Sequence, residues 1–498
     1  MSRVILFFPK SEEKDAVLLP ASVLMVAAPL VKVGYNVKII DQRVDKEWQK
    51  ILLDEIKKQP LVFGVSALTG KQILNGLEAS KLVKENSRVP VVWGGVHASL
   101  LPRQTLENKY IDFVVLGEGE ETFRELVMAI EKKGGFQNIH GLGYKKKDQI
   151  FLNPQREFID LNNIPEIPYH LINPERYIAK QSFATGKSAR NIALYTSRGC
   201  PHRCGFCYNQ EFNRRRWRGK SAERVVEEMK KLINDYQINS FEIEDDEFFV
   251  DLERARKICE LIIKENLNVE IFTSCRVNYV ANNMDDEYLN LLYRAGFKTL
   301  AFGVESGSER ILDLIHKDIT IEQVFTTIEK LKKVGINSKY YFMAGFPTET
   351  IEDLYSTTDL IRKMKQLDPQ IRIPGWRVFT PYPGTDLYKL AIQEGWQPPK
   401  TLEEWANYDF ATVKMPWVKG KKERIIKNVS FLINYLEMSK TRGRGFFFKL
   451  AKLFGKIVDW RWRNHLVLFV PERLFLEMVL AIKKLYYIFL KKYQVIKN

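Results

Sequence analysis

The chain has 498 residues, of which 45% are hydrophobic and 28% charged, and this balance excludes disordered and collagen-like proteins. A chain of this length is expected to form two or three domains, each large enough for a buried core. The net charge is +16 at pH 7, but residues 419–498 carry 19 Lys and Arg against 5 Asp and Glu, so the basic character belongs to the tail.

Cysteine usage and the apolar runs predict a cytoplasmic protein. The five cysteines are too few for a disulfide framework, and three of them fall within eight residues, which indicates a reducing compartment and a metal. The first apolar run is followed at once by charged residues, unlike a secretory signal. Residues 474–490 are the longest apolar stretch near the length of a membrane span, but three charges interrupt them, so we expect no spanning helix.

The first part of the chain, residues 1–135, alternates short apolar runs with amphipathic stretches. Buried parallel strands are predicted at residues 4–8, 36–41, 61–68, 90–95 and 112–120. Helices are predicted between them, for instance at residues 21–33 and 70–86. This alternation predicts an α/β, doubly wound, Rossmann-like domain that binds a ligand beyond the carboxyl ends of its strands.

Proline-rich residues 136–185 are predicted to be a linker, and strand and helix signals resume in residues 186–400. Strands are predicted at residues 191–197, 240–246, 269–275, 299–306, 338–345 and 371–379, with helices between them, for instance at 222–236 and 321–334. About six β/α units in a row predict a partial or full TIM-like parallel barrel with its chemistry at the carboxyl ends of the strands. Residues 401–498 are predicted to form a helical C-terminal region.

The cysteine motif lies directly after the first predicted barrel strand. Cys200, Cys204 and Cys207 have the spacing C-x-x-x-C-x-x-C, which places three thiolates in one loop at the mouth of the barrel. Thiolates are soft ligands that suit iron–sulfur clusters or zinc. Three of them leave one iron of a cubane cluster without a protein ligand, so that a small chelating substrate can bind there.

A zinc site with His202 as the fourth ligand is the alternative for this loop, as is a chance group of cysteines. Zinc sites usually combine one C-x-x-C unit with a second pair far away. Cys259 lies in a helix-like stretch and Cys275 in a predicted strand, where buried apolar roles are the simpler interpretation. The sequence therefore favours the cluster.

The cysteine motif, with the aromatic residues Phe206 and Tyr208 beside its last cysteine, resembles the signature of the radical SAM superfamily. The resemblance implies a [4Fe-4S] cluster on Cys200, Cys204 and Cys207, whose free iron is chelated by S-adenosylmethionine. It further implies reductive cleavage to a 5′-deoxyadenosyl radical, with Tyr208 among the cofactor-binding residues. Cofactor chemistry of this kind needs the protein mainly for orientation and for the exclusion of side reactions.

Other segments resemble the same superfamily at the ends of later strands. The resemblance implies that Glu244, Asp245 and Asp246 contact the methionyl amine, that Arg276 pairs with the methionyl carboxylate, and that Glu305 binds the ribose or methionyl group. Residues 344–350 and 380–388 match the later strands of the same subgroup. The alternative for each carboxylate is a helix cap or a surface charge.

The first domain resembles the cobalamin-binding domain of the cobalamin-dependent radical SAM enzymes, a subgroup that includes C-methyltransferases and anaerobic magnesium-protoporphyrin ester cyclases. Residues 64–69, 94–102 and 114–123 carry the resemblance, and glycines there would let the backbone approach a large flat ligand. The residues implied to line the cobalamin site are Ser66, Thr69, Gly94, Gly95, His97, Gly117, Glu118 and Gly119. The alternative is a degenerate fold that no longer binds cobalamin.

One departure from the wider cobalamin-binding group concerns the lower axial ligand of cobalt. Mutases and methionine synthase carry a D-x-H-x-x-G motif, whereas the corresponding residues 13–22 contain no histidine. His97 is not at the usual place for that ligand. We therefore expect cobalamin without a histidine lower ligand, which favours transfer of methyl as a radical.

The basic tail contains a predicted amphipathic helix at residues 446–462. Lys449, Lys452 and Lys456 share one face, while the other carries Leu450, Leu453, Phe454 and Ile457. Such a helix either contacts an anionic membrane surface, at the inner face of the membrane, or packs its apolar face on the barrel. Nucleic acid is a less favoured partner, because no RNA-binding module is recognised.

The leading functional hypothesis is methylation of an unactivated carbon of a small-molecule or lipid-like substrate. One S-adenosylmethionine would methylate reduced cobalamin, a second would supply the radical, and flavodoxin or ferredoxin would supply electrons. The alternative reaction is radical oxidative cyclisation or rearrangement of a tetrapyrrole-like or lipid-like substrate. A cobalamin-binding sensor or scaffold is the alternative outside the enzymes, and the intact cysteine triad argues against it.

Overall fold

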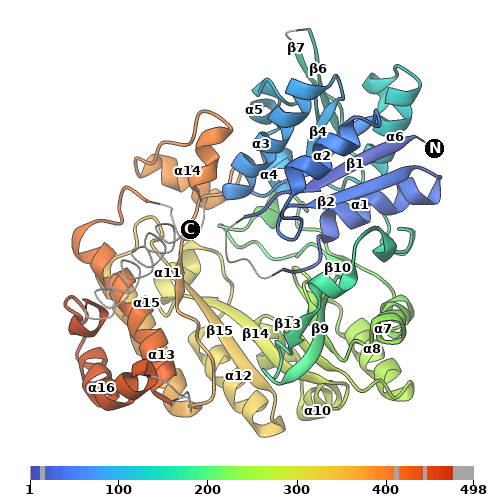
Figure 1. Ribbon diagram of the computed structural model, residues 1–498. Helices are drawn as coiled ribbons and strands as arrows, with labels where there is room; N and C mark the ends of the chain where they lie inside the picture. Colours follow the sequence, from blue (N-terminus) through green and yellow to red (C-terminus); the bar gives the residue numbers. More distant parts are fainter. Residues whose placement is uncertain (1, 12–16, 148, 409–413, 441–445, 475–498) are drawn as a thin grey trace, which may run out of the picture.

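A computed structural model describes residues 2–11, 17–147, 149–408, 414–440 and 446–474. Two large sheets, each flanked by helices, form two lobes that lie against each other (Figure 1). The N-terminal lobe carries the first sheet, and the second sheet begins at residue 179. A pair of C-terminal helices lies at the far edge of the second lobe.

The first sheet has seven strands in the order β2-β1-β3-β4-β5-β6-β7, and its first five strands are parallel. The parallel strands are β1 (Arg3–Phe8), β2 (Asn36–Asp41), β3 (Val62–Ser66), β4 (Val91–Gly94) and β5 (Phe113–Val115). The helices are α1 (Ala21–Lys32), α2 (Trp48–Ile56), α3 (Lys71–Asn86), α4 (Val96–Leu100), α5 (Pro102–Glu107) and α6 (Glu120–Glu131). Strand order reverses between β1 and β3, the position where doubly wound folds bind their ligands.

The predicted linker also contributes to this sheet. A hairpin of β6 (Leu142–Lys146) and β7 (Gln149–Leu152) adds antiparallel to β5. Leu142 and Tyr144 are buried on one face, and the Tyr144 ring lies 6.1 Å from the ring of Phe136. The lysines at 145–147 and the following prolines hide this alternation in the sequence, so a strand pair is found where a linker is predicted.

The second sheet has the order β16-β15-β14-β13-β12-β9-β8. Its strands are β8 (Ala179–Gln181), β9 (Ser188–Leu194), β12 (Ser240–Ile243), β13 (Glu270–Ser274), β14 (Phe297–Glu305), β15 (Asn337–Ala344) and β16 (Trp376–Val378). All pairs from β9 to β16 are parallel, while β8 runs antiparallel to β9. Because β16 and β8 are the two edges, the barrel is partial.

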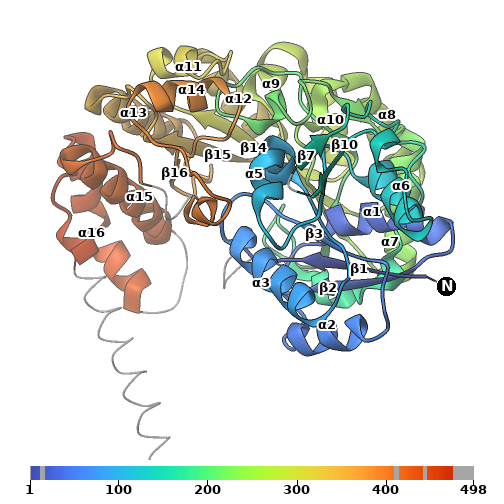
Figure 2. The ribbon, with the colours of Figure 1, turned by 90° about the horizontal axis from the view of Figure 1, so that it is seen from above.

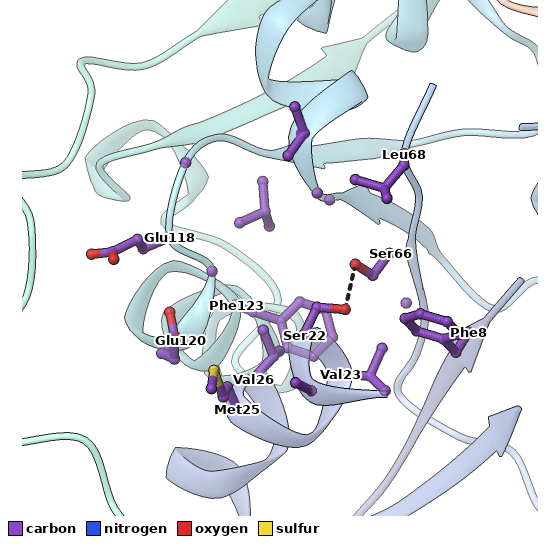
Figure 3. A pocket seen from close by; sticks show the side chains of 18 of the residues that line it. Phe8, Ser22, Val23, Met25, Val26, Ser66, Leu68, Glu118, Glu120 and Phe123 are labelled. Atoms are coloured by element: carbon purple, nitrogen blue, oxygen red, sulfur yellow. Dashed lines mark hydrogen bonds between the residues drawn. The ribbon is translucent and has the colours of Figure 1, made fainter. Parts of the chain in front are cut away.

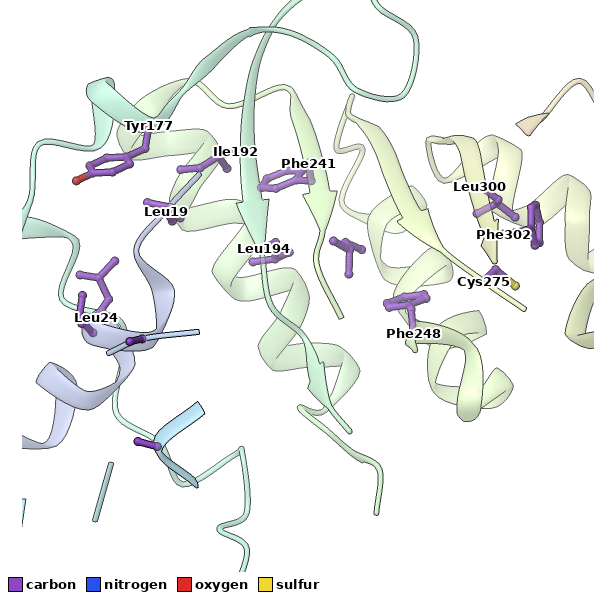
Figure 4. Packing of buried hydrophobic residues seen from close by; sticks show 14 of the residues in the cluster. Leu19, Leu24, Tyr177, Ile192, Leu194, Phe241, Phe248, Cys275, Leu300 and Phe302 are labelled. Carbon is purple, nitrogen blue, oxygen red and sulfur yellow. The ribbon is translucent and has the colours of Figure 1, made fainter. Parts of the chain in front are cut away.

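Helices cover the outer face of the second sheet. They are α7 (Ala222–Tyr236), α8 (Leu252–Lys264), α9 (Val277–Asn283), α10 (Asp286–Arg294), α11 (Glu309–Leu314), α12 (Ile321–Val334) and α13 (Ile351–Leu367). Helix α14 (Asp386–Gln393) begins beside the cysteine loop, where the Leu387 amide donates to the carbonyl of Gly205. The apolar core is continuous from α1 of the first lobe through β9 and β12 to β14, as Figure 4 shows for Leu24, Leu194 and Phe302. The two lobes therefore share buried surface.

The C-terminal helices α15 (Gly420–Lys440) and α16 (Phe446–Arg463) pack beside α13 (Figure 2). The buried indole of Trp462 donates to the carbonyl of Thr358 at 3.2 Å, and Val458 is buried on the same side of α16. No helix among the described residues is long and apolar enough to cross a bilayer. Residues 475–490 and the side chains of Lys449, Leu450, Lys452 and Leu453 lie outside the described part.

Candidate cofactor site between the two lobes

A cavity of about 400 Å³ lies at the strand-order reversal of the first sheet. Its floor is formed by residues at the carboxyl ends of β1, β3 and β4, including Phe8, Ser66 and Gly94. Figure 3 shows Ser66 and Phe8 on one side of the cavity and Glu118 on the other. The barrel lobe closes the cavity with Tyr195, Arg198, Tyr208, Phe212, Asn213 and Asp246. The cavity is therefore shared between the two lobes.

Two glycines of the cavity, Gly94 and Gly117, leave room that a side chain would fill. A Cβ added at Gly94 would meet only Val115, at 3.8 Å, and one added at Gly117 would meet nothing within 4 Å. Gly117 has a φ of +67°, a left-handed conformation that favours glycine. Gly119 and the Ser66 hydroxyl, which donates to Ser22 at 2.9 Å, also line the cavity. A largely apolar wall with bare backbone fits a large, flat ligand such as cobalamin.

Two residues expected in the cobalamin site lie outside the cavity lining. The Thr69 hydroxyl and His97 Nδ1 are 3.0 Å apart, and the imidazole is fully buried beside the ring of Trp405. Burial lowers the pKa of His97 to about 4. Gly95 lines the cavity with its backbone, and a Cβ there would lie 2.7 Å from the carbonyl oxygen of Ala67.

The cysteine loop is closed at its base by a short antiparallel ribbon. Strand β10 (Ser197–Arg198) precedes Cys200, and β11 (Arg218–Gly219) follows the loop. Gly199 has a φ of +83°, and a Cβ there would clash with the carbonyl of Arg216 at 2.0 Å, so only glycine permits this tight return of the chain.

The three thiols of the loop are close enough to affect one another electrostatically. Burial raises the pKa of Cys200 and of Cys207 to about 12, and neighbouring cysteines add to both shifts. Buried thiols of this kind become thiolates when a cation binds them. Within the described ranges, no three or more Cys, His, Asp or Glu side chains are grouped closely enough to hold a metal ion. The three thiols would therefore have to move closer together to hold a cluster.

His202 does not join the thiols. Its Nε2 lies 2.9 Å from the Tyr279 hydroxyl, and the two rings meet edge to face. Burial lowers the pKa of His202 to about 4, and Arg276 and Lys317 lower it further. This engagement disfavours the alternative of a zinc site with His202 as fourth ligand.

The carboxylates after β12 hold the cysteine loop. Asp245 is buried and accepts from the Thr196 amide at 2.6 Å and from the Ser197 hydroxyl at 2.6 Å. Asp246 accepts from the Gly199 amide at 2.8 Å and from the Tyr208 hydroxyl at 3.1 Å. These contacts give both aspartates an anchoring role, and Asp246 also reaches the cavity wall.

A buried charged group surrounds Cys204. The Arg276 guanidinium donates to Cys204 Sγ at 3.4 Å and to the carbonyl of Lys317, and the Lys317 ammonium pairs with Glu305 at 3.0 Å. Glu305 has a φ of +70°, a strained backbone of the kind that is concentrated at functional sites. Arg276 and Glu305, both expected from the sequence, therefore lie together beside the cysteine loop.

Two members of this group were not singled out from the sequence. Lys317 follows α11 in a loop that matches no recognised motif. The folded chain nevertheless buries this lysine, which is only 6% exposed. Glu247 is 3% exposed, and burial raises its pKa to about 7 despite the nearby Arg276 and Lys317. Glu247 could have been noticed, because an acid between Asp246 and two phenylalanines is unusual at the end of a buried strand.

The concave face of the partial barrel carries further polar residues. Glu242 stands in register with Phe272 of β13, whose side chain belongs to a small cluster separate from the main core, so Glu242 lies on the face opposite the covering helices. Burial and then the neighbouring Glu244 raise the pKa of Glu242 to about 9. The Lys339 ammonium lies over the same Phe272 ring at 5.7 Å and over Tyr341 at 5.0 Å. Glu244 is thus placed at the barrel mouth, beside Glu242.

Family models match both halves of this arrangement. The model described as the radical SAM superfamily matches residues 194–361, and the model described as the B12 binding domain matches residues 15–127. An uncharacterized methyltransferase of Pyrococcus horikoshii is 36% identical over 375 residues, which cover 74% of this chain and 78% of that protein.

Two further proteins are similar to the chain, one in sequence and one in three-dimensional structure. An anaerobic magnesium-protoporphyrin IX monomethyl ester cyclase of Rubrivivax gelatinosus is 28% identical over 74% of this chain and 66% of its own length. The structure of the cobalamin-dependent S-adenosylmethionine radical enzyme OxsB, with aqua-cobalamin and S-adenosylmethionine bound, matches with a TM-score of 0.72 at 16% identity, over 97% of this chain and 75% of that one. The latter similarity is one of fold.

Proposed function

Because the chain belongs to the cobalamin-dependent radical SAM enzymes, we propose that it transfers a methyl group to an unactivated carbon of a small-molecule or lipid-like substrate. The cofactors of this family are a [4Fe-4S] cluster, S-adenosylmethionine and cobalamin. The single observation that carries the proposal is the shared cavity, which Gly94 and Gly117 of the first lobe line together with Arg198 of β10 and Tyr208 of the cysteine loop. Methyl donor and radical source would then meet in one space.

Each cofactor is assigned its own residues. Cys200, Cys204 and Cys207 would hold the cluster, and the buried cations Arg276 and Lys317 beside Cys204 would neutralise the carboxylate of a bound amino-acid group. When bound, the cluster with S-adenosylmethionine supplies a carbon radical and cobalamin supplies the methyl group. Because Cys204, Arg276 and Lys317 are buried, water is excluded from their surroundings.

Cobalamin is proposed to bind without a histidine below the cobalt. None of the described residues that line the cavity is a histidine, and His97 is turned toward Thr69 and Trp405. The cobalamin-binding unit is proposed to comprise residues 1–135 together with the β6–β7 hairpin, and the radical SAM unit residues 186–400. The substrate is proposed to enter the concave face between Glu242 and Lys339, with flavodoxin or ferredoxin as reductant.

Product analysis separates methylation from the cyclisation that the similarity to the anaerobic cyclase also suggests. The anaerobically reconstituted enzyme, given methyl-labelled S-adenosylmethionine and a reductant, is expected to form labelled methylcobalamin even before a substrate is known. Incubation with an extract of small molecules and lipids should then yield a labelled product. Deoxyadenosine formation with no label on cobalamin or on any product would favour radical cyclisation or rearrangement instead.

Contact with an anionic lipid surface is proposed for the C-terminal region. Ile457 and Trp460 of α16 are 51% and 56% exposed, and Phe469 is 67% exposed, while Val458 and Trp462 on the other side of the helix are buried. Large apolar side chains left in water within a strongly basic segment are typical of interfacial membrane binding. Because α16 packs against α13 through its buried side, Ile457 and Trp460 take no part in that packing.

Vesicle binding tests the lipid contact. The double variant Ile457→Ser/Trp460→Ser is expected to bind vesicles containing phosphatidylglycerol roughly tenfold more weakly than the natural chain, because apolar burial in the interface is lost. Phe151→Ser/Phe183→Ser removes exposed aromatic side chains elsewhere and should leave binding unchanged. Sedimentation with the vesicles measures both. Equal binding of all three proteins, or none by the natural chain, would contradict the proposal.

A further inference from the structure

The ribbon at the base of the cysteine loop holds two arginines directly opposite each other. Arg198 of β10 is the register partner of Arg218 of β11, so both side chains leave the ribbon on the same face. Like charges directly opposite on paired strands destabilise the pair. Asp245 holds the ribbon through Ser197, but only a counter-charge on the arginine face can offset this repulsion.

Glu118 of the first lobe supplies that charge. Its carboxylate accepts from Arg198 Nη1 at 2.9 Å and from Arg218 Nη1 at 2.8 and 2.7 Å. Glu120, two residues later at the start of α6, pairs with the second nitrogen of Arg198. The Glu118 side chain is only 6% exposed and the arginines 20% and 18%, so solvent screens these pairs weakly.

The same residue belongs to the wall of the cavity. Glu118 stands between Gly117 and Gly119, the backbone loop proposed to face cobalamin. Its second oxygen also accepts from the Ile159 amide at 3.3 Å, and the Arg218 guanidinium lies 4.1 Å from the Phe158 ring centre. First lobe, connecting segment and cysteine loop therefore meet at one carboxylate.

We propose that Glu118, Arg198 and Arg218 form an interdomain clamp that fixes the position of the cysteine loop relative to the cobalamin cavity. The clamp rests on the function proposed above, since it concerns the alignment of two cofactor sites. Glu118 is then a positioning residue, which acts through the ribbon. Its backbone faces the cavity, while its side chain forms ion pairs with the other lobe.

The clamp is separable from the general attachment of the lobes. Trp405 donates to Gln104 at 2.8 Å and Tyr177 to Asp41 at 3.0 Å, and neither contact involves a residue of the ribbon. These contacts stay when Glu118 changes. Loss of its charge is therefore expected to loosen the ribbon locally, where Arg218 would lose its carboxylate partner and Arg198 would keep only Glu120, and to leave the fold intact.

The first test measures the loop without any cofactor. In Glu118→Gln, hydrogen exchange at residues 199–219 of the full-length apoprotein is expected to become roughly tenfold faster, since a buried charge pair is lost. Exchange in β1 and β14 should not change. The matched control is Glu157→Gln, which removes the exposed pair of Glu157 with Arg216 at 3.5 Å, on the same loop. Equal protection in all three proteins would overturn the clamp.

The second test measures the two sites together. After reconstitution with iron, sulfide and cobalamin, dipolar coupling between the reduced cluster and cob(II)alamin should give one narrow distance in the natural chain and a broader distribution in Glu118→Gln. Adding Arg218→Met to Glu118→Gln relieves the repulsion and should narrow the distribution again, which a purely structural defect would not do. Unchanged distances in Glu118→Gln would refute the clamp and leave the proposed function standing. A natural chain that takes up neither iron nor cobalamin would instead refute the proposed function.

Discussion

Replacement of Cys204 by alanine is expected to abolish both cluster assembly and cleavage of S-adenosylmethionine. Cys204 is the most buried of the three loop thiols, and Arg276 donates to its sulfur at 3.4 Å. With two thiolates left, a cubane cluster lacks the ligands that retain it. Iron should fall from about four atoms per chain to less than about one. Deoxyadenosine formation after reduction should drop by a factor of roughly a thousand or more.

The control for this variant is Cys259→Ala. Cys259 is fully buried in α8, away from the loop, so its loss removes a small apolar volume and costs about 1 kcal/mol of stability without touching the cluster. Iron and sulfide analysis of anaerobically prepared protein, with the broad visible absorbance, measures both variants. Cys204→Ala protein that keeps its iron and its deoxyadenosine formation would contradict the assignment, as would zinc in place of iron in the natural chain.

Much of the fold could be predicted because periodicity is a local property. The strand predicted at residues 36–41 and the helix predicted near 321–334 match β2 and α12 residue for residue. The β6–β7 hairpin was missed because its lysines and nearby prolines mask a short alternation. Whether the barrel is partial or full depends on which strands form the edges, and strand order is a property of the whole sheet.

The candidate site could be predicted only in part, since motifs name residues but not their partners. Glu118 was expected near cobalamin from its glycine-rich segment, yet Arg198 and Arg218 meet it from 80 and 100 residues away. Thr69 and His97 also belong to matching segments, but they bond to each other outside the cavity. Lys317 has no motif around it, and only the folded chain brings it to Glu305.

Replacement of Gly94 by leucine is expected to block cobalamin binding while the cluster remains. Gly94 ends β4 at the cavity floor and pairs with Ser66 of β3 through its backbone, which the substitution keeps. The new Cβ would meet Val115 at 3.8 Å, an ordinary contact, so the strand should tolerate it. The rest of the leucine would occupy the cavity. Cobalamin affinity should fall by a factor of about 100 or more, which corresponds to roughly 3 kcal/mol.

Gly134→Leu makes the same chemical change where the structure leaves space. A Cβ at Gly134 meets nothing within 4 Å, and the half-buried residue lies shortly after α6, away from the cavity lining. Titration of each anaerobic protein with cobalamin, followed by visible absorbance, gives the affinities, and iron analysis shows whether the cysteine loop is intact. Gly94→Leu that binds cobalamin as tightly as Gly134→Leu would place the cofactor elsewhere. Loss of iron in Gly94→Leu would instead mean that the change disturbs the fold, and Gly94→Ala, a smaller intrusion, should then keep its iron and lose affinity by a lesser factor.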